Sequence, residues 1–486
     1  MKVPVATFFT GFLLLAGAAI AEDQPAAQST PVAPKTDTAP ITAAGFALDD
    51  VGFFVVDLKD GRVVAEHNAD RPFIPASVAK IATIAAALTI LGGDHTFTTT
   101  LLADGAVKDG VLSGSLILKG GGDPFLTGDD LQAMAKDLAA AGIKRVDGTF
   151  LYDATSAIEV PQINAMQPEA AGYNTGVSAL SVNFNRVRVN WQRSAKAASA
   201  IAAAVSEHVT QPVDAIGLAF AEEDAAGPYV RAGIASEDRW LLSPDLAAKG
   251  QDWLPVGNPS LVTAEVFRAL AAAQGVDLPA PTPGPAPEGA RQVTQHDSIP
   301  LTNIARAVLR YSNNLSAELI GLAASRALTG RSLSLADSAS ALAAWWKLRL
   351  ADADWSGMVL ANHSGLSSDS RTTPRQIVTM LEEAATSAGG ADFHELLKHI
   401  GWKGVKGSAR VKTGTMSYAR GLAGYIDTAA GNRLAFAIFF NDMGKRAALD
   451  AAFDPRVKEI DPASRPWRTR ALKLEEKYTT GWAEQF

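Results

Sequence analysis

The chain has 486 residues, more than one hydrophobic core usually organises, so two or three domains are expected. Its composition, 47% hydrophobic and 20% charged, is typical of a globular protein, and a net charge of -7 with no run of Lys and Arg argues against nucleic acid as a partner. The absence of cysteine excludes disulfides, thiol nucleophiles and cysteine metal sites.

The N-terminus has the pattern of an export signal. Lys2 precedes an apolar stretch over Ala6–Ile20, which ends in the small-residue cleavage pattern Ala19-Ile20-Ala21. The alternative is a membrane anchor, but Pro4 interrupts the apolar run, and no later segment has the roughly 20 apolar residues of a membrane span. We interpret residues 1–21 as a signal peptide and expect a periplasmic protein without a transmembrane anchor after cleavage.

The first folded segment follows a leader over residues 22–45, which is rich in Pro, Ala and Thr and predicted to be flexible. Two strands are predicted over Val51–Leu58 and Arg62–Glu66, because Lys59-Asp60-Gly61 between them is typical of a hairpin turn. The sequence Ala76–Leu91 is apolar almost all round and predicts a buried helix.

Residues 96–295 have a different sequence pattern from the segments before them, with short strand-like pieces separated by glycine-containing turns. Within them the alanine-rich stretch Ser194–Glu207 predicts a helix, and the proline-rich stretch Leu278–Ala290 predicts an extended segment on the surface. The helices and strands predicted after this stretch are Leu301–Leu309, Leu315–Ala327, Ala336–Leu348, Gly421–Asp427 and Arg433–Asn441. Strands at both ends suggest one domain, 46–95 with 296–486, interrupted by an inserted region of one or two small domains over 96–295.

Ser77 and Lys80 form the first motif of chemical interest, S-x-x-K, at the start of the predicted buried helix. Positions i and i+3 share a helix face, so the hydroxyl and the amine can approach each other. Lys80 is the only charged residue of this helix, and desolvation would lower its pKa towards that of a general base. The alternative is a serine helix cap followed by a lysine that reaches water.

Two further motifs lie later in the chain. In Ser312-Asn313-Asn314 a hydroxyl and an amide can face one cleft, with Ser312 shuttling a proton and Asn314 holding a substrate amide, although helix capping is an alternative. Lys412-Thr413-Gly414-Thr415 places a lysine and two hydroxyls on one strand, which suits a terminal carboxylate of a substrate. An exposed edge strand with a protective lysine is the alternative there.

Together and in this order, S-x-x-K, S-x-N and K-T-G are the motif set of penicillin-binding proteins and serine β-lactamases. The long interval between the first two motifs resembles the penicillin-binding protein 4-like D-alanyl-D-alanine carboxypeptidase/endopeptidases, which carry a large insertion there. Further segments resemble that family: Gly120-Gly121-Gly122-Asp123-Pro124, Val177-Ser178-Ala179-Leu180-Ser181-Val182-Asn183, Leu254-Pro255-Val256-Gly257-Asn258-Pro259 and Ser364-Gly365-Leu366-Ser367.

The resemblance implies an α/β (α+β) fold, a β-lactamase/transpeptidase-like domain with an antiparallel sheet sandwiched by helices and a large mixed α/β insertion. It implies that Ser77 is acylated, with Lys80 as its base, and that Ser312 and Lys412 relay the proton. Asn314 would bind the substrate amide, and Thr413 and Thr415 its carboxylate, with Gly414 between them as a further substrate-binding residue. The oxyanion would bind the backbone N–H groups of Ser77 and Thr415. The substrates would be peptidoglycan peptides, with β-lactams as covalent inhibitors, and no cofactor is required.

Substrate side-chain preference stays open in the sequence. Glu169 is the nearest candidate for recognising an amino group on the substrate's side chain, and Ser368 stands where the resemblance suggests an arginine, with Arg371 nearby. His394 and His399 imitate a zinc-protease motif, but their i, i+5 spacing points them about 140° apart on a helix, so no metal is predicted.

Two other functions remain as alternatives. A serine β-lactamase would need a second base for deacylation, and Glu318 follows Ser312 too closely to be the usual loop-borne glutamate. A non-catalytic peptidoglycan-binding protein of the same fold would not be acylated by penicillin.

Overall fold

A computed structural model describes residues 36–194, 196–222, 227–234, 237–457 and 461–486. The predicted signal peptide, 1–21, and most of the predicted leader lie outside these residues. None of the helices in the described part of the chain is long and apolar enough to cross a membrane.

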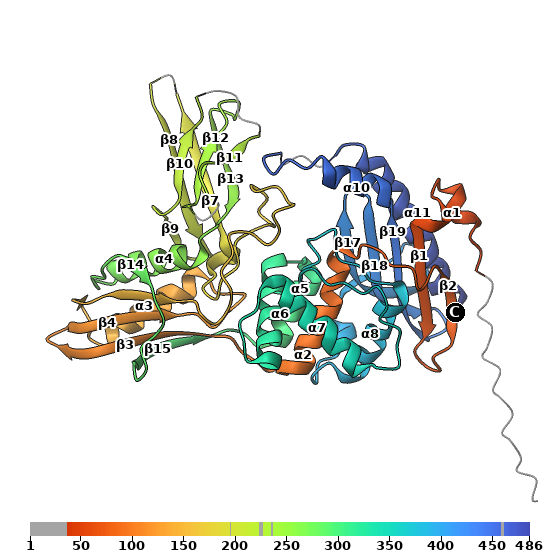
Figure 1. Ribbon diagram of the computed structural model, residues 1–486, viewed down its shortest axis with the longest axis horizontal. Helices are drawn as coiled ribbons and strands as arrows, with labels where there is room; N and C mark the ends of the chain where they lie inside the picture. The colour runs from red at the N-terminus through yellow and green to blue at the C-terminus, as the bar shows by residue number, and fades with distance from the viewer. Residues whose placement is uncertain (1–35, 195, 223–226, 235–236, 458–460) are drawn as a thin grey trace, which may run out of the picture. The chain divides into compact units, whose positions relative to one another are not determined.

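The central sheet has six antiparallel strands drawn from both ends of the chain. In sheet order they are β16 (Lys398–Gly401), β17 (Gly407–Met416), β18 (Ala419–Thr428), β19 (Arg433–Asn441), β1 (Val51–Asp57) and β2 (Val63–His67). Figure 1 shows β1 next to β19, at opposite ends of the colour scale. The predicted strand pairs at both ends are therefore confirmed.

Both faces of this sheet are buried, which explains why its strands are almost continuously apolar. Phe53 and Val55 of β1 pack in a core with the C-terminal helix α11 (Ser464–Gln485), whereas Phe54 and Val56 point into a core on the opposite face. The alternation follows from the two-residue period of a strand. An antiparallel sheet between helical layers confirms the predicted α/β (α+β) fold class.

The helices on the second face carry the segments that build the site. They are η2 (Ala76–Ala79, a 3-10 turn), α2 (Lys80–Leu91), α5 (Leu301–Tyr311), α6 (Asn314–Thr329), α7 (Leu335–Arg349) and α8 (Pro374–Ser387). Four predicted helices are thus confirmed, with α2 preceded by a tighter turn. The remaining helices are α1 (Ala39–Ala43), α3 (Gly128–Ala140), α4 (Pro259–Ala273), α9 (Phe393–Leu396) and α10 (Met443–Ala451).

Residues 96–295 form three further sheets around a separate apolar core. The first contains β3 (Thr98–Lys108), β4 (Val111–Lys119), β5 (Arg145–Val146), β6 (Phe150–Asp153), β14 (Pro281–Pro283) and β15 (Arg291–Asp297). The second contains β7 (Arg186–Arg193), β8 (Ala198–Val205), β9 (Thr210–Pro212) and β13 (Lys249–Pro255). The third contains β10 (Gly217–Phe220), β11 (Tyr229–Arg231) and β12 (Arg239–Leu242).

The helix predicted over Ser194–Glu207 is wrong, because Ala198–Val205 is strand β8, paired antiparallel with β7 and β9. Alanine has the highest intrinsic helix propensity, but such propensities are worth only a few tenths of a kcal/mol per residue, and cross-strand pairing outweighs them here. The alternate residues Ala202 and Ala204 pack in the core of this region, as the two-residue period of a strand requires. The proline-rich stretch Leu278–Ala290 contains β14, which pairs with β6 at the sheet edge, where proline is tolerated.

Candidate active site

Ser77 lies in the 3-10 turn η2, immediately before helix α2. The preceding residue, Ala76, has a left-handed backbone (φ 46°), which costs free energy in a residue with a Cβ atom. Gly365 makes this conformation possible, because a Cβ there would lie 1.9 Å from the Ala76 carbonyl oxygen. The N-cap residues are Pro75 for η2 and Ala79 for α2, and Ser77 Oγ is hydrogen-bonded to Lys80, so this serine does not serve as the N-cap of either helix.

Lys80 is completely buried and therefore does not reach water. Its Nζ donates to Asn314 Oδ1 at 2.7 Å and to the backbone carbonyl of Ser364 at 2.6 Å, and it lies 3.0 Å from Ser77 Oγ. Three segments far apart in the sequence thus meet at one amine.

Burial lowers the pKa of Lys80 well below its ordinary value, because the ammonium loses its hydration. The positive charge of Lys412 lowers this pKa further, and the carboxylate of Glu318 opposes the shift. Desolvation, the cause predicted from the sequence, is the largest cause of this lowered pKa, and Lys412 adds to it.

The Ser312-Asn313-Asn314 segment connects α5 to α6, and its three side chains point to different tasks. Asn313 caps α6 by accepting from the backbone N–H of Ser316, so the capping interpretation holds for this residue alone. Ser312 has a left-handed backbone (φ 61°), and its Oγ accepts from Lys412 Nζ at 2.9 Å. Asn314 holds Lys80 through Oδ1, while its Nδ2 donates to the carbonyl of Tyr173.

Lys412 is not the exposed lysine of an edge strand, because only 1% of it is exposed. Its Nζ donates to Ser312 Oγ and to the carbonyl of Thr413. Burial, and secondarily the charge of Arg420, lowers the pKa of Lys412 to about 7. Near neutral pH this amine therefore exists in both protonation states.

Strand β17 approaches Ser77 closely because of Gly414. A Cβ at this position would lie 2.4 Å from the Pro75 carbonyl oxygen and 3.1 Å from the Ser77 nitrogen. Strand β16 pairs with β17 only over 408–411, so no strand of the described residues lies beside the K-T-G-T segment on that edge. Thr413 and Thr415 on this segment are exposed and accessible to a ligand.

Two side chains that support this site have no sequence motif of their own. Glu318, completely buried, accepts from the backbone N–H groups of His363 and Ser364, and so fixes the turn whose carbonyl binds Lys80. Arg420 donates to Thr415 Oγ1 and forms a buried ion pair with Glu475. The sequence signal for Glu318 was an acidic residue within the otherwise mostly apolar first half of helix α6.

The candidates for side-chain recognition have other partners in the structure. Glu169 accepts from the backbone N–H of Arg231 at 3.0 Å. Arg371 donates to the backbone carbonyls of Ser368 and Ser370. Neither side chain lines the cavity beside Ser312.

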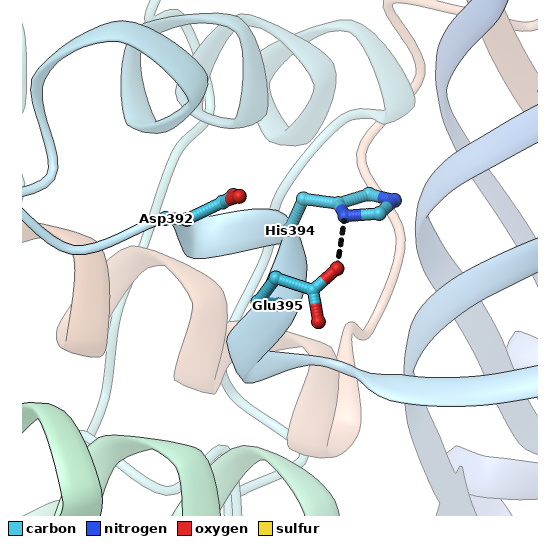
Figure 2. Close-up of side chains that lie close together, drawn as sticks. All are labelled: Asp392, His394 and Glu395. Carbon is cyan, nitrogen blue, oxygen red and sulfur yellow. Dashed lines mark ion pairs between the residues drawn. The ribbon is translucent and has the colours of Figure 1, made fainter.

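His394 and His399 do not share a helix, because α9 ends at Leu396 and His399 lies in β16. Among the described residues, one group has the composition of a metal site, namely Asp392, His394 and Glu395 (Figure 2). The imidazole of His394 lies 3.2 Å from Glu395 and 3.1 Å from Asp427, and Arg410 also pairs with Glu395. His394 and Glu395 of this group are thus engaged with each other and with Asp427 and Arg410.

The fold and the site together define an enzyme of the β-lactamase/transpeptidase-like class. The family model of the D-Ala-D-Ala carboxypeptidase 3 (S13) family matches residues 41–457. The chain therefore belongs to this family, whose members are serine-type D-Ala-D-Ala carboxypeptidases.

Similar proteins agree with this family. A D-alanyl-D-alanine carboxypeptidase from Actinomadura sp. is 28% identical, over 87% of this chain and 84% of that protein. The D-alanyl-D-alanine carboxypeptidase DacB from Haemophilus influenzae is 22% identical, over 81% and 85%. The crystal structure of penicillin binding protein 4 from H. influenzae superposes with a TM-score of 0.70 at 20% identity, covering 88% of this chain and 96% of that one. A second structure of that protein contains a β-lactam.

Proposed function

We propose that this chain hydrolyses D-alanyl-D-alanine-type bonds in peptidoglycan peptides and cross-links, with Ser77 as the acylated nucleophile and Lys80 as its base. The observation that carries this proposal is the burial of Lys80 with its Nζ 3.0 Å from Ser77 Oγ. Desolvation lowers the pKa of this amine and so favours the neutral form, which is the form that can accept a proton as a base.

The hydrogen-bond partners of Lys80 support this assignment. A neutral amine has two N–H donors and one lone pair. The carbonyl oxygen of Ser364 and Asn314 Oδ1 can each act only as hydrogen-bond acceptors. The orientation of the Asn314 amide is fixed because its Nδ2 donates to the Tyr173 carbonyl. With both N–H groups directed to these oxygens, the lone pair faces the third partner, the Ser77 hydroxyl.

In the proposed reaction Ser77 Oγ forms a bond to the penultimate D-alanine carbonyl carbon while its proton passes to Lys80. The oxyanion binds the backbone N–H groups of Ser77 and Thr415. Collapse breaks the C–N bond, and the leaving amine receives a proton through Ser312 and Lys412, which are hydrogen-bonded to each other. Water then hydrolyses the acyl-enzyme, and a β-lactam would acylate Ser77 by the same attack.

Substrate binding is proposed along β17. Asn314 would hold the substrate amide, Thr413 and Thr415 would bind the terminal carboxylate, and Gly414 would let the substrate approach the strand closely. The exposed threonine hydroxyls and the open strand edge support these roles. We also propose that 46–95 and 296–486 form the catalytic domain and that 96–295 is inserted into it.

The β-lactamase alternative has less support, because Glu318, its candidate second base, already accepts hydrogen bonds from the protein backbone. Both carboxylate oxygens of Glu318 accept backbone N–H groups, and the residue has no exposure to solvent. Glu318 is instead proposed to position the Ser364 carbonyl and thereby Lys80.

A fluorescent penicillin tests the proposal directly. We expect the wild type to be labelled and Ser77→Ala to lose the label completely, while Ser408→Ala, a substitution on the same sheet, keeps it. Equal labelling of Ser77→Ala and the wild type would refute the assignment of the nucleophile. Fast β-lactam hydrolysis without slow turnover of D-alanyl-D-alanine peptides would favour the β-lactamase instead.

Export to the periplasm is proposed from the N-terminal pattern and from the cell-wall substrate. Cleavage after Ala21 would leave Glu22 as the first residue of the mature protein. N-terminal sequencing of the exported protein checks this, and an intact Met1 would contradict it.

A further inference from the structure

A cavity of about 420 Å³ adjoins the Ser312-Asn313-Asn314 segment on the side of the inserted region. Four aromatic residues line much of it: Phe125, Tyr173, Phe184 and Tyr311. Ser312 and Asn314 form part of the same lining, so the cavity opens next to the groups proposed to hold the substrate.

Arg186 is the only charged side chain that lines this cavity among the described residues. Its guanidinium lies 5.7 Å from the ring centre of Trp253, and no carboxylate in the described part of the chain forms an ion pair with it. Burial lowers the pKa of Arg186, and no nearby acidic group opposes that shift. The guanidinium is thus partly desolvated without a compensating negative charge.

The backbone segment immediately before Arg186 has a strained conformation that hydrogen bonds hold in place. Asn183, Phe184 and Asn185 have left-handed backbones, with φ of 51°, 57° and 50°. Such a run of residues with Cβ atoms is costly and persists only where the surroundings enforce it. Here Asn183 Oδ1 accepts from the backbone N–H of Gly128, and Asn185 Nδ2 donates to a backbone carbonyl. The run places Phe184 and Arg186 together at the cavity.

We propose that Arg186 binds a second carboxylate of the peptide substrate, distinct from the terminal carboxylate at the scissile end. The site takes an anionic peptide group, because a planar guanidinium suits a carboxylate and because no acidic residue offers to bind an amino group there. The inference rests on the proposed function, which assigns the terminal carboxylate to Thr413 and Thr415 and leaves Arg186 free for another.

The test compares peptides that carry this second carboxylate with peptides that lack it. The set contains a short tripeptide ending in D-alanyl-D-alanine with no other carboxylate, a longer peptide with a side-chain carboxylate, its side-chain amide, and a cross-linked dimer. For the wild type we expect KM to rise about 10-fold when the side-chain carboxylate is amidated, with kcat little changed. No difference between the free and amidated peptides, together with no preference for the dimer, would overturn the proposal.

Arg186→Gln should raise KM about 10-fold for the carboxylate-bearing peptide and leave the short tripeptide and the rate of penicillin acylation unchanged. Arg186→Lys, which keeps the charge but not the planar fork, should give an intermediate KM. Arg326→Gln, a charge removal at an exposed position of α6, is the control and should change nothing. An equal loss for both peptides would also overturn the proposal.

These measurements also show which peptide chain carries the carboxylate, and they distinguish a failure of the proposed function from a failure of the proposed role of Arg186. An effect of Arg186→Gln on the dimer alone places the carboxylate on the second peptide chain, whereas an effect on the monomeric peptide places it on the same chain. Failure of the wild type to be labelled by penicillin at Ser77 would refute the proposed function, and normal labelling without carboxylate selectivity would refute only the role of Arg186.

Discussion

Two neighbouring regions differ in how they hold a cationic side chain: the Ser77 cluster, which consists of Ser77, Lys80, Ser312, Asn314 and Lys412, and the Arg186 cavity, which is the cavity lined by Arg186 and four aromatic residues. Ser312 and Asn314 belong to both regions. In the cluster, the Lys80 amine has three hydrogen-bond partners and no exposure. In the cavity, the Arg186 guanidinium has no ion-pair partner among the described residues and is partly accessible. The difference shows how chemistry and recognition place different demands on a protein: a base must be fixed in one orientation, whereas a recognition group must keep its donors free.

The largest expected effect comes from removing the base in the cluster. Lys80→Gln should reduce the rate of penicillin acylation about 10³-fold, because no other described amine lies at hydrogen-bond distance from Ser77 Oγ. Stopped-flow or gel-based labelling measures this rate. Lys403→Gln, at an exposed position, serves as the control. Acylation at the wild-type rate in Lys80→Gln would mean that another group activates Ser77.

The close approach of β17 gives the second prediction. Gly414→Ala places a methyl group against the Pro75 carbonyl, so the strand must move away from Ser77. A displacement of about 1 Å can cost about 10²-fold in rate, and we expect a loss of acylation of that size. Gly401→Ala, on the neighbouring strand with open space around it, should have no effect. Similar rates in the two variants would show that the spacing is not critical.

The support of Lys80 by Glu318 predicts a change in pH dependence. The Glu318 carboxylate raises the pKa of Lys80, so Glu318→Gln should lower that pKa further. Because attack requires the neutral amine, the rising limb of acylation rate against pH should move to lower pH. The pH profile of acylation measures this, with Glu476→Gln on the surface as the control.

The same Glu318→Gln variant should also lose stability, since an amide cannot accept from both backbone N–H groups of His363 and Ser364 in the same way. Each unsatisfied buried donor costs about 1–3 kcal/mol. If Glu318→Gln lost stability but the pH dependence of its acylation rate stayed that of the wild type, Glu318 would have a structural role only.

The smallest expected effect lies at the rim of the cavity. Tyr311 lines it and is 84% exposed, so its contact with a peptide involves little burial of its own. An aromatic contact of this kind contributes about 0.5–1.5 kcal/mol, and Tyr311→Ser should raise KM for the longer peptides roughly threefold. Steady-state kinetics with the short tripeptide provides the comparison, and a drop in kcat for that peptide would place Tyr311 in the cluster instead.

The sequence predicted the helices and strands of 46–95 and 296–486 well, because their hydrophobic patterns and turn signals are local in the sequence. Ala76–Leu91 has no polar face, and the hairpin after Val51–Leu58 has its own turn signal. The alanine-rich segment that became β8 was mispredicted, because its partners β7 and β9 supply the hydrogen bonds that an isolated segment lacks.

By itself, the sequence determined the family, the export pattern and the three motifs, since each motif depends on residue types at short, fixed spacing. It placed Ser77 near Lys80 because three residues span less than one helical turn. Only the tertiary structure brought Asn314, the Ser364 carbonyl and Glu318 to that lysine, and only it shows that Arg186 has no ion-pair partner among the described residues. Such convergence depends on chain segments separated by more than 200 positions, whose contacts follow from packing and not from any local pattern.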